Sequence, residues 1–406
     1  MKRSVIAFFL SANLALAAPA TFDRLTYHTP PKPLSPDAVT EHWPRFLGPR
    51  HDLHSNETHL LKSFPKSGPT IVWEIERGTG HTPPVIAGDY LVIIHEMNGK
   101  ETVECLQPET GKRYWKYDYP VRYGSNYGIS DAPRVPPVID GDLVFTVGVR
   151  GDLHCFDLPT GKVVWKKNLD EEYGHAPLFF GRGSCPLVYG DQLIVNVGGD
   201  FCVGSFDKRT GKLLWSSKHD DWHASYASPV PARIHDKERV LVFTGGMVRP
   251  AAGGLLSIDP ANGTVEASFP WRARMYTSVN AASPVVVGNA AFITEGYTEG
   301  GAMVEFAPDG SANLRWSAKR FGSHFTTPVA HEGYLYGIAG QGGTEMVCYE
   351  IETGKEMWRD DIDLPDARLG RASLLRVDGA FLCIGDQGTL IWLDLSPAGP
   401  KILNQA

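Results

Sequence analysis

Seven segments of the sequence place a polar side chain shortly before a small-residue stretch and an apolar run. These residues are His81, Arg134, Arg182, Tyr226, Asn280, His324 and Arg371. None is acidic, and arginine with histidine favours a carboxylate, phosphate or sulfate ligand. Tyr123, Trp222 and Tyr276 lie nearby in the sequence and could stack on a planar or sugar ring. We take this set as candidate ligand-binding residues; the alternative is that they satisfy loop backbones around a water-filled channel.

The densest polar patch is HDDWHASYAS, residues 219–228, which contains His223. Asp221 with His223 is either a proton-transfer pair or a loop histidine beside a solvated acid. No GxSxG, HExxH or P-loop motif is present, so no catalytic residue is assigned. The stretch 359–368 begins like a calcium loop but lacks its glycine and closing glutamate, so no metal site is expected.

A repeated hairpin must position these residues. The four clearest copies are CLQPETGKRYW (105–115), CFDLPTGKVVW (155–165), SFDKRTGKLLW (205–215) and CYEIETGKEMW (348–358). In the second copy, Asp157 can bond the turn backbone and Gly161 can supply a left-handed conformation. Each copy follows two apolar runs that are separated by a short turn. The repeat therefore predicts units of four short strands that bury their faces by stacking on neighbouring units.

A tryptophan ends most units and is suited to wedging between neighbouring sheets. The expected docking residues are Trp73, Trp115, Trp165, Trp215, Trp316 and Trp358, and we assign Trp271 to the same role. Counting units on this basis gives seven.

The predicted fold is all-β, a seven-bladed β-propeller of four-stranded blades. Residues 68–77 read as a final strand without a preceding unit, whereas the last unit, around 372–399, lacks a final strand. We therefore expect the N-terminal strand to pair with the last blade and close the ring. The alternative of eight blades requires another unit hidden elsewhere in the chain.

The D-x-x-T-G-K-x-x-W repeat resembles that of pyrroloquinoline quinone (PQQ)-type β-propellers, which include quinoprotein alcohol dehydrogenases and BamB-like lipoproteins. The segment 43–73 resembles the entry segment of an exported branch of this family, and the resemblance covers residues 43–394. For the quinoprotein enzymes of this family, the resemblance implies a PQQ that is held with calcium, an acidic base, and electron transfer to a haem or quinone. This chain has no carboxylate at the seven aligned polar positions named above. It also has no adjacent cysteine pair and no CxxCH motif. The acidic residues nearest to these positions in the sequence are Asp131 and Asp221.

Residues 1–20 have two basic residues, an apolar run and small residues, the layout of a cleaved secretory signal. We expect an N-terminal extension at 21–67 and the propeller at 68–406. No later run of eighteen apolar residues occurs, so we expect a soluble protein exported to the periplasm or beyond the cell. We also expect His51 and His54 to lie on the propeller surface.

The net charge is −7 without a basic block, which argues against nucleic acid as a partner. Six cysteines occur, and their main interpretation is as small buried hydrophobes, with a Cys185–Cys202 disulfide as the alternative.

Three functions remain open at this point. The first is a monomeric binding or scaffold module of the cell envelope, without a cofactor, for an anionic or sugar ligand or a protein partner. The alternative is a PQQ-dependent dehydrogenase with calcium that oxidises alcohols or sugars; another kind of enzyme, for example one acting on polysaccharides, is a third reading.

Overall fold

The computed structural model describes residues 23–124, 132–219, 222–340, 345–360, 369 and 371–406. The expected signal peptide, Asp131, Asp221 and the acidic stretch 361–368 lie outside these residues. Within the described part, the chain is almost entirely β, with a single short helix, α1 (Leu169–Tyr173). The all-β prediction is confirmed. Across the same residues, no helix has the length and apolar character needed to cross a membrane.

Seven sheets in the described residues each contain four consecutive antiparallel strands. We call them sheets 1 to 7 in chain order. Their strands are β4 (Val85–Ala87), β5 (Tyr90–Met97), β6 (Lys100–Leu106) and β7 (Arg113–Pro120); β8 (Val138–Asp140), β9 (Leu143–Val147), β10 (Asp152–Asp157) and β11 (Val163–Asn168); β12 (Leu187–Tyr189), β13 (Gln192–Asn196), β14 (Val203–Asp207) and β15 (Leu213–Ser217); β16 (Val230–Ile234), β17 (Lys237–Phe243), β18 (Gly254–Ile258) and β19 (Val265–Pro270); β20 (Val285–Val287), β21 (Ala290–Glu295), β22 (Gly300–Phe306) and β23 (Ala312–Ala318); β24 (Val329–His331), β25 (Tyr334–Ala339), β26 (Glu345–Glu350) and β27 (Glu356–Asp360); β28 (Ala372–Val377), β29 (Ala380–Gly385), β30 (Leu390–Ser396) and β31 (Gly399–Gln405).

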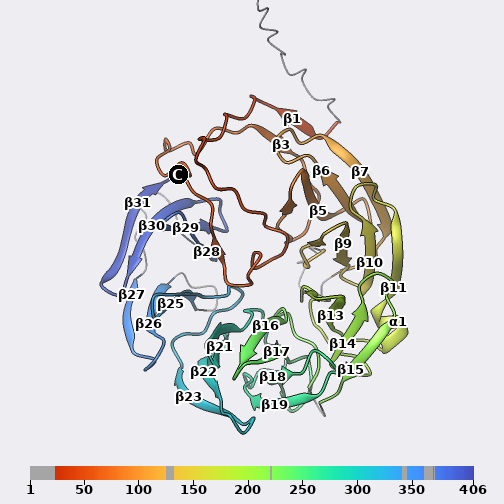
Figure 1. Cartoon of the computed structure of the whole chain (residues 1–406), viewed down its shortest axis with the longest axis vertical. Coiled ribbons are helices and arrows are strands. Elements are labelled where there is room, and N and C mark those ends of the chain that lie inside the picture. The colour runs from red at the N-terminus through yellow and green to blue at the C-terminus, as the bar shows by residue number, and fades with distance from the viewer. Residues whose placement is uncertain (1–22, 125–131, 220–221, 341–344, 361–368, 370) are drawn as a thin grey trace, which may run out of the picture.

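The sheets are arranged around a common centre in chain order (Figure 1). Buried apolar clusters join sheet 1 to sheet 2, sheet 2 to sheet 3, and so on through sheets 6 and 7. Most cores therefore lie between neighbouring sheets, as expected for repeat units that cannot bury both of their faces alone.

The repeated hairpin has the geometry that its residues predict. The Asp157 carboxylate accepts a hydrogen bond of 3.0 Å from the Thr160 N–H and another from the Thr160 hydroxyl. Gly161 has φ +69°, a left-handed conformation that costs glycine little. The strand register shifts between Cys155 and Phe156, which places a β-bulge beside the turn.

Six tryptophans dock onto the turn of the unit that follows them. The indole N–H donates to a backbone carbonyl of that turn, from Trp73 to Pro108, Trp115 to Leu158, Trp165 to Lys208, Trp215 to Pro260, Trp316 to Ile351 and Trp358 to Ser396, at 2.7–3.0 Å. The ring covers the turn glycine, and a Cβ on Gly161 would lie 2.4 Å from the Trp115 indole. All six expected docking residues occupy this position.

Trp271 does not dock, and its assignment was wrong. The register position that Trp165 holds opposite Cys155 is held in sheet 4 by Ala267 opposite Ser257. Trp271 follows β19 and lies against Phe269. Counting four residues from the turn glycine leads to Ala267, so the sequence contained the correct alignment.

The predicted closure of the ring was also wrong. The last sheet obtains its fourth strand from the C-terminus, because β31 pairs with β30 from Ser396↔Gly399 to Ile391↔Gln405. The strand expected there, β3 (Trp73–Ile75), pairs instead with β1 (Leu25–Tyr27) in a separate two-stranded sheet. The physical reason is local: the chain turns back after Ser396 and forms an adjacent hairpin, which needs no long-range closure.

The N-terminal strands β1 and β3 lie between the last and first sheets (Figure 1). On one side, a Cβ on Gly111 of sheet 1 would meet both Leu25 and Trp73. On the other side, Trp392 of sheet 7 donates to the Leu61 carbonyl at 3.0 Å, and Phe64 packs in the same cluster. The two-stranded sheet therefore lies in the sector between sheets 7 and 1.

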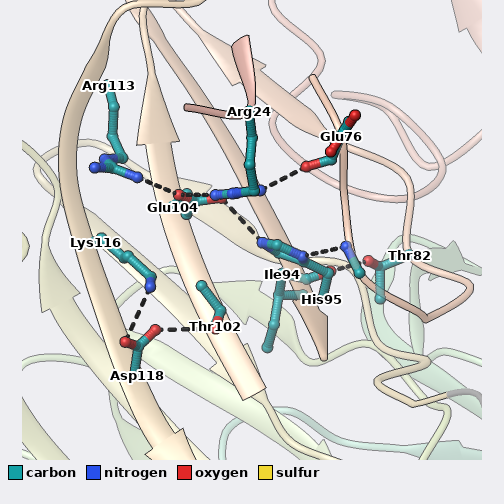
Figure 2. Close-up of polar contacts among 11 residues, drawn as sticks. Arg24, Glu76, Thr82, Ile94, His95, Thr102, Glu104, Arg113, Lys116 and Asp118 are labelled. Atoms are coloured by element: carbon teal, nitrogen blue, oxygen red, sulfur yellow. Dashed lines mark hydrogen bonds and ion pairs between the residues drawn. The ribbon is translucent and has the colours of Figure 1, made fainter. Parts of the chain in front are cut away.

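A buried carboxylate fastens β1 to sheet 1 (Figure 2). Glu104, which has a fully buried side chain, accepts hydrogen bonds from Arg24 at 2.6 Å and from Arg113 at 3.0 Å. The third partner is His95 Nε2 at 3.0 Å, and His95 Nδ1 accepts from the Gly78 N–H. Burial alone would raise the Glu104 pKa, but the bonds from His95, Arg24 and Arg113 outweigh it and lower the pKa to about 2.

All six cysteines lie in the described part of the chain, are buried and are free. The Cys185–Cys202 pairing does not form. Burial raises the pKa of both thiols to about 12, as expected for small hydrophobic side chains.

Candidate ligand-binding site

Residues 43–55, which we call the closing segment, cover one face of the propeller. Residues 43–55 run into the centre of the molecule (Figure 1). Trp43 bridges to Ile86 of sheet 1, and the Pro44 carbonyl accepts from the Ile139 N–H of sheet 2 at 2.8 Å. Leu47 is buried in the cluster of sheets 4 and 5. Further along, β2 (His54–Ser55) pairs with β28 of sheet 7.

His51 belongs to this closing segment. Its Nε2 lies 3.2 Å from an Arg45 nitrogen. Burial and the neighbouring Arg45 charge lower the His51 pKa to about 3. His54 also lies partly buried beside the His331 ring, at 5.9 Å between centroids. Both histidines are partly buried rather than fully exposed, because the segment packs across the inner strands.

The predicted site residues come just before the first strand of each sheet. They lie on the face opposite the one that residues 43–55 close. Each first strand begins at an entry segment and ends at a short turn, so the two kinds of loop lie on opposite faces. We call the face with the entry segments the entry face. The loop between the second and third strands of each sheet is on the same face, because the strands alternate in direction.

Neighbouring entry segments hydrogen-bond to one another in a chain of contacts. These bonds run from His81 N to Pro133 O, Ser184 Oγ to Ala227 O, Cys185 N to Ser228 Oγ, Ser228 N to Ser283 Oγ and Ser283 N to Thr327 Oγ1, at 2.8–3.1 Å. Small polar residues before the first strands of sheets 3 to 6 therefore tie these units together.

Arg134 and Tyr226 meet at one loop. Arg134 Nε donates to the Phe180 carbonyl at 3.1 Å, and its guanidinium lies over the Phe180 ring. The Tyr226 hydroxyl accepts from the Phe180 N–H at 2.9 Å. Burial raises the pKa of Tyr226. Both side chains are half-buried, and both contribute to holding this loop.

Arg182 is engaged within the fold. Its side chain is 5% exposed and donates to Asp170 at 2.5 Å and 3.1 Å. A further nitrogen donates to the Val197 carbonyl at 2.8 Å. Asp170 lies in the first turn of α1, whose N-terminus is capped by Asn168. Ligand binding by Arg182 remains a prediction, and these contacts favour a structural role instead.

Asn280 is buried and holds another arginine. Its Oδ1 accepts from Arg272 at 3.0 Å, and its Nδ2 donates to the Thr244 carbonyl at 2.7 Å. Arg272 also contacts the fully buried Glu295 at 2.5 Å. Burial raises the pKa of Glu295, and the Arg272 charge opposes this shift.

His324 and Arg371 form an aromatic and cationic group. The His324 ring stacks on Phe325 at 3.8 Å, and its Nε2 lies 2.9 Å from the Tyr297 hydroxyl. Arg371 is exposed and lies over the same Phe325 ring. Burial and the Arg371 charge lower the His324 pKa to about 4, so the ring is neutral at pH 7.

The aromatic patch around Trp222 is packed rather than open. Trp222 is buried and stacks on His219 at 4.0 Å. His223 Nδ1 contacts the Gly198 carbonyl at 3.1 Å. The proposed pairing of His223 with Asp221 falls outside the described residues.

Tyr276 lines a cavity of about 550 Å³ together with Arg249, Arg272 and Arg274. The sequence prediction found Tyr276 but missed the three arginines. The signal available for two of them was the alternation in WRARMY, residues 271–276. Arg249 comes from a separate loop, so only the fold places it here. A second cavity, of about 400 Å³, is lined by Glu96, Arg122 and Tyr123 in sheet 1 and the loop that follows it.

Comparison with known proteins supports the propeller fold. The family model described as outer membrane protein assembly factor BamB matches residues 99–360. The chain belongs to this family. No curated protein matches it.

Solved structures resembling this BamB-family chain are distant in sequence. BamB from Moraxella catarrhalis has 15% identity and a TM-score of 0.52, covering 80% of this chain and 84% of that one. A europium-containing methanol dehydrogenase has 12% identity and a TM-score of 0.61, covering 90% and 85%. The computationally designed Ika8 protein has 13% identity and a TM-score of 0.51, covering 87% and 90%. At these identities the likeness shows the fold alone.

The described entry face of this BamB-family chain does not fit a calcium-bound quinone. Calcium requires several carboxylate or carbonyl oxygens. Two carboxylates lie among the predicted site residues, and both are already paired: Asp170 with Arg182, and Glu295 with Arg272. No group of three or more histidine, cysteine or acidic residues in the described ranges could hold a metal ion. Arg249, Arg274 and Arg371 are exposed on this face, and their positive charges disfavour a bound cation near them.

Proposed function

We propose that this BamB-family propeller is an exported binding module of the cell envelope that holds a protein partner or an anionic or sugar ligand on its entry face. The observation that carries the proposal is the closure of the opposite face by residues 43–55, which contact sheets 1, 2, 4, 5 and 7. The entry face keeps exposed cationic side chains and both cavities described above.

The family description supports a protein partner in particular. An outer membrane protein assembly factor acts on other polypeptides, and the entry face of this chain leaves its cavities open to such a partner. Export through the N-terminal signal would place the protein where such partners are found. We expect a monomer, because no second copy is needed to complete the entry face.

Site-specific photo-crosslinking in cells tests the proposal. A photoreactive residue would replace His81 or Arg371, which are both exposed on the entry face. Matched controls would replace Asp89 or Asp191, which are exposed in first-hairpin turns on the opposite face. We expect discrete adducts from the entry positions only. Equal adducts from both faces, or adducts from the control face alone, would contradict the assignment.

The quinoprotein alternative has a separate test. The purified mature protein would be titrated with PQQ and calcium while its melting temperature is followed, and dye reduction would be assayed with alcohols and sugars. We expect no saturable stabilisation and no turnover. Stabilisation together with dye reduction would replace the binding-module proposal with a dehydrogenase.

A further inference from the structure

Three arginines converge on the cavity beside sheet 4. Arg249 comes from the loop between β17 and β18, whereas Arg272 and Arg274 follow β19. Both loops lie on the entry face, since they connect the second to the third strand and the fourth strand to the next sheet. Two chain segments thus supply the lining of one hollow of about 550 Å³.

Arg272 forms a fixed base for this cavity. Its side chain is 4% exposed and held by Glu295 at 2.5 Å, Asn280 at 3.0 Å and the Ser278 carbonyl at 2.8 Å. Its Nε is buried and has no hydrogen-bond partner among the described residues. A buried N–H of this kind is costly unless a further acceptor completes it.

The other two arginines carry unbalanced charge. Arg249 lies over the Tyr276 ring, with its guanidinium carbon 3.8 Å from the ring centroid, which orients the planar guanidinium. Arg249 and Arg274 are exposed, and neither has a carboxylate partner within the described ranges. Glu295 balances Arg272 only. The cavity therefore keeps two net positive charges, which attract and orient carboxylates.

We propose that the Arg249–Arg272–Arg274 cavity is the specific docking site for a short acidic segment of a polypeptide partner, with its carboxylates on the guanidinium groups and an aliphatic or planar part on Tyr276. This inference rests on the proposed function and narrows it. The volume is within the range of small-ligand sites and exceeds what a single inorganic oxyanion needs. Two exposed guanidinium groups on separate loops also match successive carboxylates rather than one.

Fluorescence anisotropy with a fluorescein-labelled tetraglutamate peptide tests the inference on the purified mature protein. A tetraglutamine peptide of the same length is the uncharged probe. We expect saturable binding of tetraglutamate, weakened by added salt, and none of tetraglutamine. The double variant Arg249→Gln with Arg274→Gln should bind at least about tenfold more weakly, because two charge-assisted contacts are lost.

The matched control is Arg233→Gln in β16. Arg233 is 65% exposed, so the variant removes one positive charge without removing a buried contact. It should bind tetraglutamate like the wild type. Equal losses in the control and the double variant would show attraction to net charge only and overturn the site. Inorganic phosphate that displaces the peptide at equal concentration would identify a simple anion site and also overturn the proposal.

The two proposals fail separately. If entry-face crosslinks persist in the double variant while wild-type protein does not bind tetraglutamate, the binding face stands and the acidic-segment site is wrong. If tetraglutamate binds as expected but crosslinks arise only from the opposite face, the cavity binds acidic peptide and the partner face has been misassigned.

Discussion

Replacing Glu104 by glutamine should release the N-terminal strand from sheet 1. Glu104 is fully buried and joins Arg24, Arg113 and His95. The variant leaves two guanidinium groups facing a neutral amide in a buried place. Removing one member of such a cluster costs about 3 kcal/mol of unfolding free energy. The loss should be measured by urea unfolding at pH 7, followed by far-UV circular dichroism.

The pH dependence of unfolding gives a second value for the free energy that the Glu104 carboxylate contributes. The Glu104 pKa falls from 4.5 to about 2 in the folded protein. Because the folded value is depressed, its contribution is fully present above pH 4.5 and is lost as the pH falls towards 2. The shift corresponds to about 3 kcal/mol, of which about 1.4 kcal/mol is lost by a pH of about 3.5. The stability gap between wild type and Glu104→Gln should narrow by that amount.

A local readout separates release of the strand from general destabilisation. Trypsin cleaves after Arg24, and this bond is protected while the Arg24 guanidinium holds Glu104. We expect faster cleavage there in Glu104→Gln at pH 7, detected by mass spectrometry of the intact chain. Glu305→Gln is the control, because the carboxylate of Glu305 is 50% exposed and pairs with Arg315 at the surface. It should cost less than about 1 kcal/mol.

A stability gap that stays constant from pH 7 to about 3.5 would refute the depressed pKa of Glu104. A Glu104→Gln variant as stable as Glu305→Gln would refute the role of the cluster itself.

Three further substitutions test the packing. Trp165→Ala should cost about 3 kcal/mol in urea unfolding, because it empties the space over the next turn, whereas Trp271→Ala, outside the docking register, should cost less; equal costs would contradict the docking role. Gly161→Ala should lower the melting temperature more than Gly141→Ala, since both have positive φ but only the first would meet an indole, at 2.4 Å; a larger drop for the second would exclude this contact. Arg182→Ala should destabilise the protein by about 3 kcal/mol by leaving its carboxylate partner without a counter-charge, and an unchanged urea midpoint would return this residue to the ligand-binding set.

The repeat could be read from sequence because its information is local. Asp157, Thr160 and Gly161 form a turn from bonds within four residues, and Trp165 follows at a fixed spacing. The same local counting would have excluded Trp271. Alternating apolar runs then predict strands, and stacking of incomplete units predicts the ring.

The closure of the ring could not be read in the same way. Nothing within the sequence of β3 distinguishes pairing with the last sheet from pairing with β1, because both provide an extended partner. The choice depends on long-range contacts, such as Arg24 with Glu104 across 80 residues. Such contacts form only when distant segments have been brought together by the rest of the fold.

The candidate site shows the same division. The sequence by itself determined the family-type repeat, the docking tryptophans and the face on which the unit-specific loops gather, because each follows from spacing along one unit. Only the tertiary structure decided that Arg182 is buried against Asp170, whereas Arg249 and Arg274 share an open cavity with Tyr276. Whether an arginine is neutralised or available depends on which carboxylates lie near it in space, and residue type and spacing do not fix those neighbours.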